Sequence, residues 1–293
     1  MSVSTISSNA ERKLAWRALL LFLLFVSIFS FIFSYIEITY KNSSIFLIAG
    51  SMWGPGFAAI LTCLLLRRKI SSLPWGWGDW KWNQQAYLLP IIYGAIIYLP
   101  IWLFGLGGSG FGNEETLQAW SASIIGEGGY SDWAVLFNIL MLMSIGVIVS
   151  ASRALGEEIG WRGFMIWEMR KLMPFWAVGV FSGLIWAMWH WPVILFSVYN
   201  AGEGSFYLQL FFFTMSVLPI GIILAYLTFK SKSLWPAVIL HASHNLYIQK
   251  LYTPITIKGP NTHFYIDEFG TMMPIVLWIF ALIYLKKGNN EKL

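Results

Sequence analysis

Long apolar segments recur along this chain, and they constrain its fold more than any other feature. A helix that crosses a membrane needs about 20 mostly apolar residues. Only 11% of the residues are charged, whereas a soluble domain has about 25%. The predicted fold is therefore all-α, a polytopic membrane helix bundle with about eight transmembrane helices at 15–37, 45–66, 86–106, 134–156, 174–197, 207–229, 234–251 and 272–286.

The length of 293 residues suits one bundle, so we expect a single integral membrane domain over residues 1–293. The first apolar segment begins near Ala18 and follows three basic residues, as in a signal peptide. It lacks a small-residue cleavage site, so it is predicted to remain as an anchor. The single cysteine, Cys63, excludes an internal disulfide and any site built from several cysteines.

The basic residues alternate between the connecting segments, and such a bias sets the orientation of a membrane protein. Only Lys41, Lys250 and Lys258 are predicted to lie outside. Both termini are therefore expected in the cytoplasm of a prokaryotic cell, and the chain in its inner membrane. The dispersed charge, +5 in total, does not indicate nucleic acid as a partner. The sixteen basic residues placed inside are Arg12, Lys13, Arg17, Arg67, Arg68, Lys69, Lys81, Arg153, Arg162, Arg170, Lys171, Lys230, Lys232, Lys286, Lys287 and Lys292.

Two connecting segments have unusual compositions. The outer segment 106–133 is rich in glycine, and because no strand precedes it, a flexible loop is expected rather than a phosphate-binding loop. The inner segment 73–82 contains four tryptophans. Tryptophan is enriched at the membrane–water interface, so this segment is predicted to anchor the bundle there.

Two adjacent carboxylates, Glu157 and Glu158, follow the apolar segment 134–156. An ionisable residue at membrane depth costs a few kcal/mol and is by default a candidate for function. In a helix Glu158 and Arg162 lie on one face and form an ion pair. Glu157 is rotated by about 100° from Glu158, which leaves it free to face a cavity. Alternatively, these charges and Arg153 form a solvated helix end near the cytoplasm.

Polar groups also occur on two later apolar segments. His190 has no other ionisable residue nearby in sequence, and His241, His244 and Asn245 share one side of a helix. Taken alone, each of these residues is explained as a polar group that forms a hydrogen bond between two helices. Together with Glu157, however, they match the needs of peptide hydrolysis. That reaction requires a base to activate water, donors for the oxyanion and an acid for the leaving amine.

These residues, in this order, resemble the motifs of the CPBP family, also called the Abi family, which includes CAAX prenyl endopeptidases and bacteriocin-processing enzymes. The resemblance covers about residues 134–250, which we expect to form the catalytic core helices. The three motifs are Glu-Glu-x-x-x-Arg at Glu157, Glu158 and Arg162, an aromatic residue (usually Phe) before x-x-x-His at Trp186 and His190, and His-x-x-x-Asn or Asp at His241 and Asn245.

The resemblance implies an intramembrane endopeptidase with a cavity open to the cytosolic side. Its partners are expected to be membrane lipid and a membrane-associated peptide or protein substrate. We expect Glu157 to take a proton from water and His190 to help hold that water. His241 and Asn245 are expected to face the oxyanion, with Glu158 and Arg162 in support. Trp186, in place of Phe, is expected to alter only the shape of the cavity.

The predicted spans contain one geometric conflict. His190 lies about 24 Å of helix beyond Pro174, deep in the membrane. Glu157, by contrast, falls near the cytosolic edge if its span ends at residue 156. Either residues 157–172 return into the membrane, or the predicted span boundaries are wrong.

No cofactor is expected, because the chain lacks the His-Glu-x-x-His helix of many zinc proteases. Zinc is the alternative, with Glu157, His190 and His241 as ligands, or with His244 in place of Glu157. Two other functions remain open. The chain is alternatively an ion-coupled transporter, since intramembrane Glu, Arg and His also build proton relays. It is otherwise a non-catalytic immunity or scaffold protein with the same fold.

Overall fold

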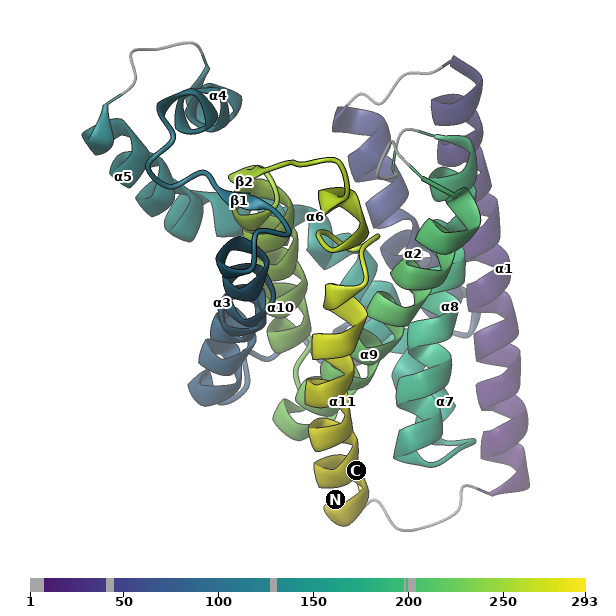
Figure 1. The fold of residues 1–293 in the computed structure, drawn as a ribbon. Helices are drawn as coiled ribbons and strands as arrows, with labels where there is room; N and C mark the ends of the chain where they lie inside the picture. The colour runs from purple at the N-terminus through teal and green to yellow at the C-terminus, as the bar shows by residue number, and fades with distance from the viewer. Residues whose placement is uncertain (1–7, 41–44, 127–130, 198, 200–203) are drawn as a thin grey trace.

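The computed structural model is a bundle of long helices (Figure 1). Within the described residues, seven helical stretches are long and apolar enough to cross a membrane. On α1 (Asn9–Tyr40), large apolar side chains such as Leu20 and Phe31 are 64% and 68% exposed, as expected for a helix that faces lipid. The chain is therefore an integral membrane protein with a helical fold. The structure describes residues 8–40, 45–126, 131–197, 199 and 204–293.

The remaining helices of the bundle follow in chain order, and short connections join them. They are α2 (Ile45–Leu65), α3 (Trp80–Leu103), α5 (Asp132–Met141), α6 (Val147–Gly160), the five-residue α7 (Ile166–Arg170), α8 (Phe175–Phe196), α9 (Phe206–Ser231), α10 (Trp235–Leu246) and α11 (Met272–Asn290). The connections contain α4 (Glu114–Ile125), the 3₁₀ turns Ile70–Ser72 and Thr262–Phe264, and the two-residue strands β1 (Gly108–Ser109) and β2 (Thr256–Ile257).

The fourth predicted span is much longer than expected. Helices α5, α6 and α7 form one continuous run, joined by π-helical turns at Leu142–Gly146 and Trp161–Met165. The part that is long and apolar enough to cross a membrane extends from Trp133 to Arg170. The predicted end at residue 156 is therefore wrong, and Glu157 lies inside a helix rather than at its edge. This removes the conflict with the depth of His190.

The predicted span 234–251 is helical, but it is not among the seven apolar stretches. Helix α10 continues into a π-helical turn at Tyr247–Tyr252. It packs against α3, α6 and α9, and nearly all of its side chains are buried. A helix that protein surrounds on several sides does not need an apolar surface, so it can carry His241 and His244.

The glycine-rich segment 106–133 is more ordered than predicted. It contains α4 and β1, and β1 pairs with β2 in antiparallel register, Gly108 opposite Ile257. This pair is the sheet that the described residues form, a small exception to the all-α prediction. At Gly110 a side chain would collide with the carbonyl oxygen of Ile255, which explains the glycine there. Residues 127–130 of the predicted loop lie outside the described residues.

Helices α2 and α6 approach each other closely because glycines line their contact. A Cβ atom at Gly156 would lie 2.6 Å from Cα of Trp53, and one at Gly160 would lie 2.5 Å from Cβ of Pro55. Membrane helices commonly use small residues in this way to bring their backbones together. The contact fixes the position of α6 beside Glu157 and Glu158.

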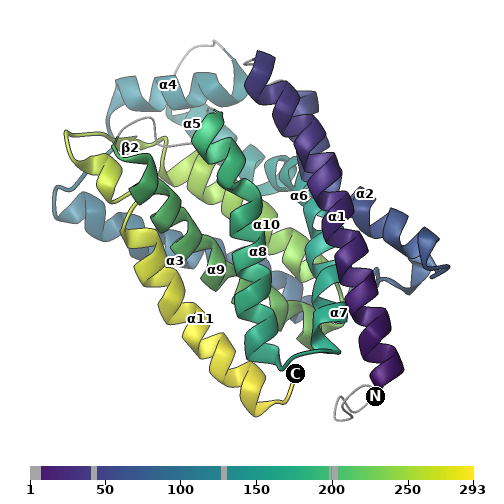
Figure 2. The same cartoon turned by 90° about the vertical axis from the view of Figure 1, so that its right-hand side faces the viewer.

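The two ends of the bundle are distinct (Figures 1 and 2). The start of α1, the end of α11, and the connections 66–79 and 231–234 lie at one end, which we call the basic end. Helix α4 and the β1–β2 pair lie at the other end, which we call the distal end. Arg162 was predicted in a cytoplasmic connection, but it is fully buried inside the bundle.

Candidate active site

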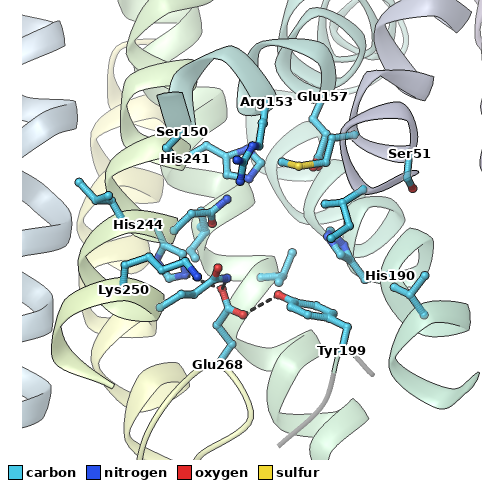
Figure 3. Close-up of a pocket in the computed structure, with 18 of the residues that line it drawn as sticks. Ser51, Ser150, Arg153, Glu157, His190, Tyr199, His241, His244, Lys250 and Glu268 are labelled. Carbon is cyan, nitrogen blue, oxygen red and sulfur yellow. Dashed lines mark hydrogen bonds and ion pairs between the residues drawn. The ribbon is translucent and has the colours of Figure 1, made fainter. Parts of the chain in front are cut away.

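A cavity of about 540 Å³ lies within the bundle, and the predicted catalytic residues line it together. Glu157 comes from α6, His190 from α8, and His241 and Asn245 from α10. In Figure 3, Glu157 and His241 lie toward one end of the cavity, and Glu268 lies toward the other. Three segments far apart in sequence therefore bring these side chains to one space.

Glu157 is held at the cavity wall by a residue of α8. The indole Nε1–H of Trp186 donates a hydrogen bond of 2.8 Å to Oε2 of Glu157. The carboxylate is only 1% exposed, and its Oε1 atom has no hydrogen-bond partner among the described residues. One oxygen is thus fixed by the protein while the other is left for a ligand in the cavity. Phe at position 186 would lack this donor, so Trp186 affects more than the shape of the cavity.

Glu158 is the centre of a buried charged group. Its Oε1 atom lies 3.0 Å from Nη1 of Arg162 and 2.8 Å from Nδ1 of His241. The predicted Glu158–Arg162 ion pair is confirmed, and both side chains are 0% exposed. The guanidinium also lies over the Trp186 ring, 4.3 Å from its centroid, a cation–π contact. Because an ionised carboxylate only accepts hydrogen bonds, Nδ1 of His241 is the donor to Glu158.

His190 and Asn245 present polar atoms to the cavity. Nδ1 of His190 donates to the backbone carbonyl of Trp186 at 3.0 Å, which leaves Nε2 as an acceptor. Asn245 is half-buried and makes no hydrogen bond within the described part of the chain. Arg153, one helical turn before Glu157, also lines the cavity but forms no ion pair with a described carboxylate.

A second polar group, missed in the sequence, occupies another part of the cavity wall. Glu268 accepts from Tyr199 at 2.6 Å and from Gln249 at 3.0 Å, and it pairs with His244 at 2.8 Å. Burial opposes its charge, but these partners lower the pKa of Glu268 to about 2. Burial and the adjacent Glu268 raise the pKa of Asp267 to about 7. Asp267 and Glu268 are two adjacent carboxylates beside an apolar segment, which is the same sequence pattern that identified Glu157 and Glu158.

The residues do not form a metal site of the kind proposed as the alternative. Within the described chain, no three His, Cys, Asp or Glu side chains are grouped closely enough to hold a metal ion. His244 uses Nε2 for Glu268 and Nδ1 for the Tyr93 hydroxyl, which lies 2.5 Å away. Neither proposed ligand set therefore fits zinc as arranged here. Glu157, His190 and His241 are not grouped closely enough, and both ring nitrogens of His244 already have partners.

Known proteins match the part of the chain that contains this site. Residues 133–247 match the model of a family described as type II CAAX prenyl endopeptidase, Rce1-like. CAAX prenyl protease 2 of Methanococcus maripaludis is 30% identical over 141 residues, which cover 47% of this chain and 48% of that protein. The alignment thus spans about half the length of this curated relative.

The matched residues 133–247 include the Glu157, His190, His241 and Asn245 side chains that line the cavity. The same motifs, in the same order, carry the resemblance seen in the sequence. Over residues 133–247 the chain is therefore similar to the Rce1-like CAAX prenyl endopeptidases, in agreement with the resemblance to the CPBP family.

Proposed function

We propose that this protein is an intramembrane endopeptidase that hydrolyses a peptide bond of a membrane-associated peptide or protein. The observation that carries the proposal is the convergence of Glu157, His190, His241 and Asn245 on one cavity inside the bundle. The family match over the same residues supports the reaction class. Glu157 is the proposed general base, because it lines the cavity and its Oε1 has no hydrogen-bond partner among the described residues.

The proposed reaction uses water as the nucleophile. Oε1 of Glu157 takes a proton from a water that also donates a hydrogen bond to Nε2 of His190. The oxygen of that water attacks the carbonyl carbon and forms a tetrahedral intermediate. Glu157 then gives the proton to the leaving amine nitrogen as the C–N bond breaks. The hydrogen bond from Trp186 keeps the carboxylate in position through both proton transfers.

Asn245 and His241 are the proposed donors to the oxyanion of the intermediate. The amide of Asn245 has two N–H groups and no protein acceptor among the described residues. His241 already donates from Nδ1 to Glu158, so Nε2 donates only when the imidazole is protonated. The Glu158 carboxylate stabilises that imidazolium as an ion pair. Glu158 is thus proposed to keep His241 oriented and charged, and Arg162 to hold Glu158 in place, without either contacting the substrate.

The proposed location is a prokaryotic inner membrane with both termini in the cytoplasm. The distribution of basic residues supports this orientation, because most of the described lysines and arginines lie at the basic end. Arg153 and Arg162 line or enter the bundle interior, and omitting them leaves the asymmetry intact.

The reaction class is tested with the purified protein and a library of membrane-associated peptides, analysed by mass spectrometry. The wild-type protein should create new internal termini, and His190→Ala should lose this activity because the water is no longer held. If both proteins cleave the same bonds at the same rate, the cleavage comes from a contaminant. Peptides that stay intact beside a folded wild-type protein contradict an endopeptidase.

Metal dependence is tested separately by elemental analysis and by exhaustive chelation of the active protein. We propose a reaction that needs no metal, so cleavage should continue at the wild-type rate after chelation. One tightly bound zinc per chain, whose removal stops cleavage and whose return restores it, contradicts this mechanism.

A further inference from the structure

The two ends of the bundle differ in charge. The connection at the basic end that follows α2 carries three consecutive cations, residues 67–69, and the other connections at that end add more. The described residues of the distal end include only two cations, Lys250 and Lys258. Exposed carboxylates, Glu114 and Glu115, begin α4 there. The bundle therefore has a polarity of charge along the membrane normal.

The cavity opens at the distal end. Its lining residues on α1 and α2 are Ser34, in the last two turns of α1, and Ile48 and others in the first two turns of α2. Exposed lining residues such as Ser123 and Lys250 belong to distal elements, whereas Glu157 is buried at 1% exposure. No described residue of the basic-end connections 66–79 and 231–234 lines the cavity.

These two observations have a joint consequence for access to the site. Connections rich in Lys and Arg stay in the cytoplasm when a membrane protein inserts. We infer that the cavity opens away from the cytoplasm and receives its substrate from the outer side of the membrane. This inference rests on the proposed function, and it differs from the cytosolic opening that the family resemblance implies.

The inference narrows the substrate class. A peptide that reaches Glu157 from the distal end has its scissile bond in or beside the outer leaflet. The substrate is then an exported peptide, or the outer juxtamembrane segment of a membrane protein, rather than the tail of a cytosolic protein. The lining around His190 is aromatic, with Trp189 and Phe213 in ring contact at 4.6 and 5.1 Å. An apolar residue of the peptide suits this wall.

Cysteine labelling tests the orientation without any need for activity. The background is Cys63→Ser, because Cys63 is the only cysteine and is buried. Ser123→Cys places a thiol at the distal mouth, and Ser71→Cys places one in the connection after α2; both serines are exposed. A membrane-impermeant maleimide is added to spheroplasts that express each variant, before or after permeabilisation.

We expect Ser123→Cys to react in sealed spheroplasts and Ser71→Cys to react only after permeabilisation. The reverse pattern overturns the inference. In a second arm, an impermeant peptide substrate added outside should be cleaved equally fast with and without permeabilisation. Cleavage that requires permeabilisation also overturns the inference. If labelling shows the expected pattern but no peptide is cleaved in either state, the orientation stands and the proposed peptidase function fails.

Discussion

At the residue scale, the contact that most directly concerns catalysis joins Trp186 to Glu157. Trp186→Phe should lower kcat roughly tenfold to a hundredfold, because a hydrogen bond to a charged group contributes about 1.5–3 kcal/mol. KM and the melting temperature should change little, since Phe preserves most of the ring. Steady-state kinetics and thermal unfolding of the purified variant measure these quantities.

The matched control for this prediction is on the same helix. Nε1 of Trp191 donates to Oγ1 of Thr214 at 3.1 Å, and Trp191 does not line the cavity. Trp191→Phe should therefore retain the wild-type kcat. An unchanged kcat in Trp186→Phe, or an equal loss in Trp191→Phe, shows that the bond to Glu157 does not position the base.

A second prediction concerns the buried charge of Arg162. Arg162→Ala should lower the free energy of unfolding by about 3–5 kcal/mol, because it removes the guanidinium from the fully buried Glu158 carboxylate, which keeps only His241 as a partner. Arg68→Ala is the comparison: Arg68 is 22% exposed, and its partner Glu168 keeps a second cation, Lys171. That change should cost about 1 kcal/mol or less. Equal losses of stability in a denaturation series argue against a special role for the buried pair.

Local spacing explains which residue contacts were predictable. Glu158 and Arg162 are one helical turn apart, so the sequence alone predicts their ion pair. The contact of Glu158 with His241 joins residues 83 positions apart, and it depends on how α6 packs on α10. Glu268 lies in a connection between apolar segments, so a hydropathy profile does not identify it. The pair of adjacent carboxylates that it forms with Asp267 could have identified it.

At the element scale, hydropathy located the outer helices but not the boundaries near the site. A π-helical turn inserts an extra residue without a change in composition, so the turn at Trp161–Met165 has no apolar signature. Because α6 and α7 contain polar residues, the hydropathy pattern predicted that the span ends at residue 156. These polar residues are tolerated because the bundle, rather than lipid, surrounds them. For the same reason α10 is buried in the centre of the bundle although it is not among the helices that are long and apolar enough to cross a membrane.

The close contact between α2 and α6 gives a prediction at this scale. Gly156→Ala should lower both the melting temperature and kcat, the latter roughly tenfold or more, because the new Cβ meets Trp53 and displaces the helix that carries Glu157. Ala otherwise stabilises a helix relative to Gly, by about 1 kcal/mol. A loss of stability would therefore identify the packing contact as its cause.

Gly76→Ala is the control for the glycine prediction, since a Cβ at Gly76 meets no atom within 4 Å. Its melting temperature and kcat should equal those of the wild type. If Gly156→Ala is as stable and as active as Gly76→Ala, helices α2 and α6 have room to separate without moving the site.

At the scale of the whole molecule, the bundle combines an apolar outer surface, which a membrane requires, with a polar interior, which the proposed reaction requires. The outer helices present apolar side chains to lipid, whereas α6, α8 and α10 bring polar groups to an interior cavity. The sequence predicted both the membrane fold and the residues that meet, since charged groups in apolar segments are few. The resemblance implied a cytosolic opening, but the residues alone do not predict at which end the cavity opens, because that depends on where each lining residue lies along its helix.

The most direct test of the whole proposal is the turnover of Glu157→Gln on a peptide that the wild-type protein cleaves. Gln has nearly the same shape as Glu, so packing and the melting temperature should be preserved, but it cannot take a proton from water. General-base catalysis contributes about 10²- to 10⁴-fold, so kcat should fall by at least a hundredfold. Turnover close to that of the wild type, in a variant that is folded and free of contaminating protease, would contradict Glu157 as the base.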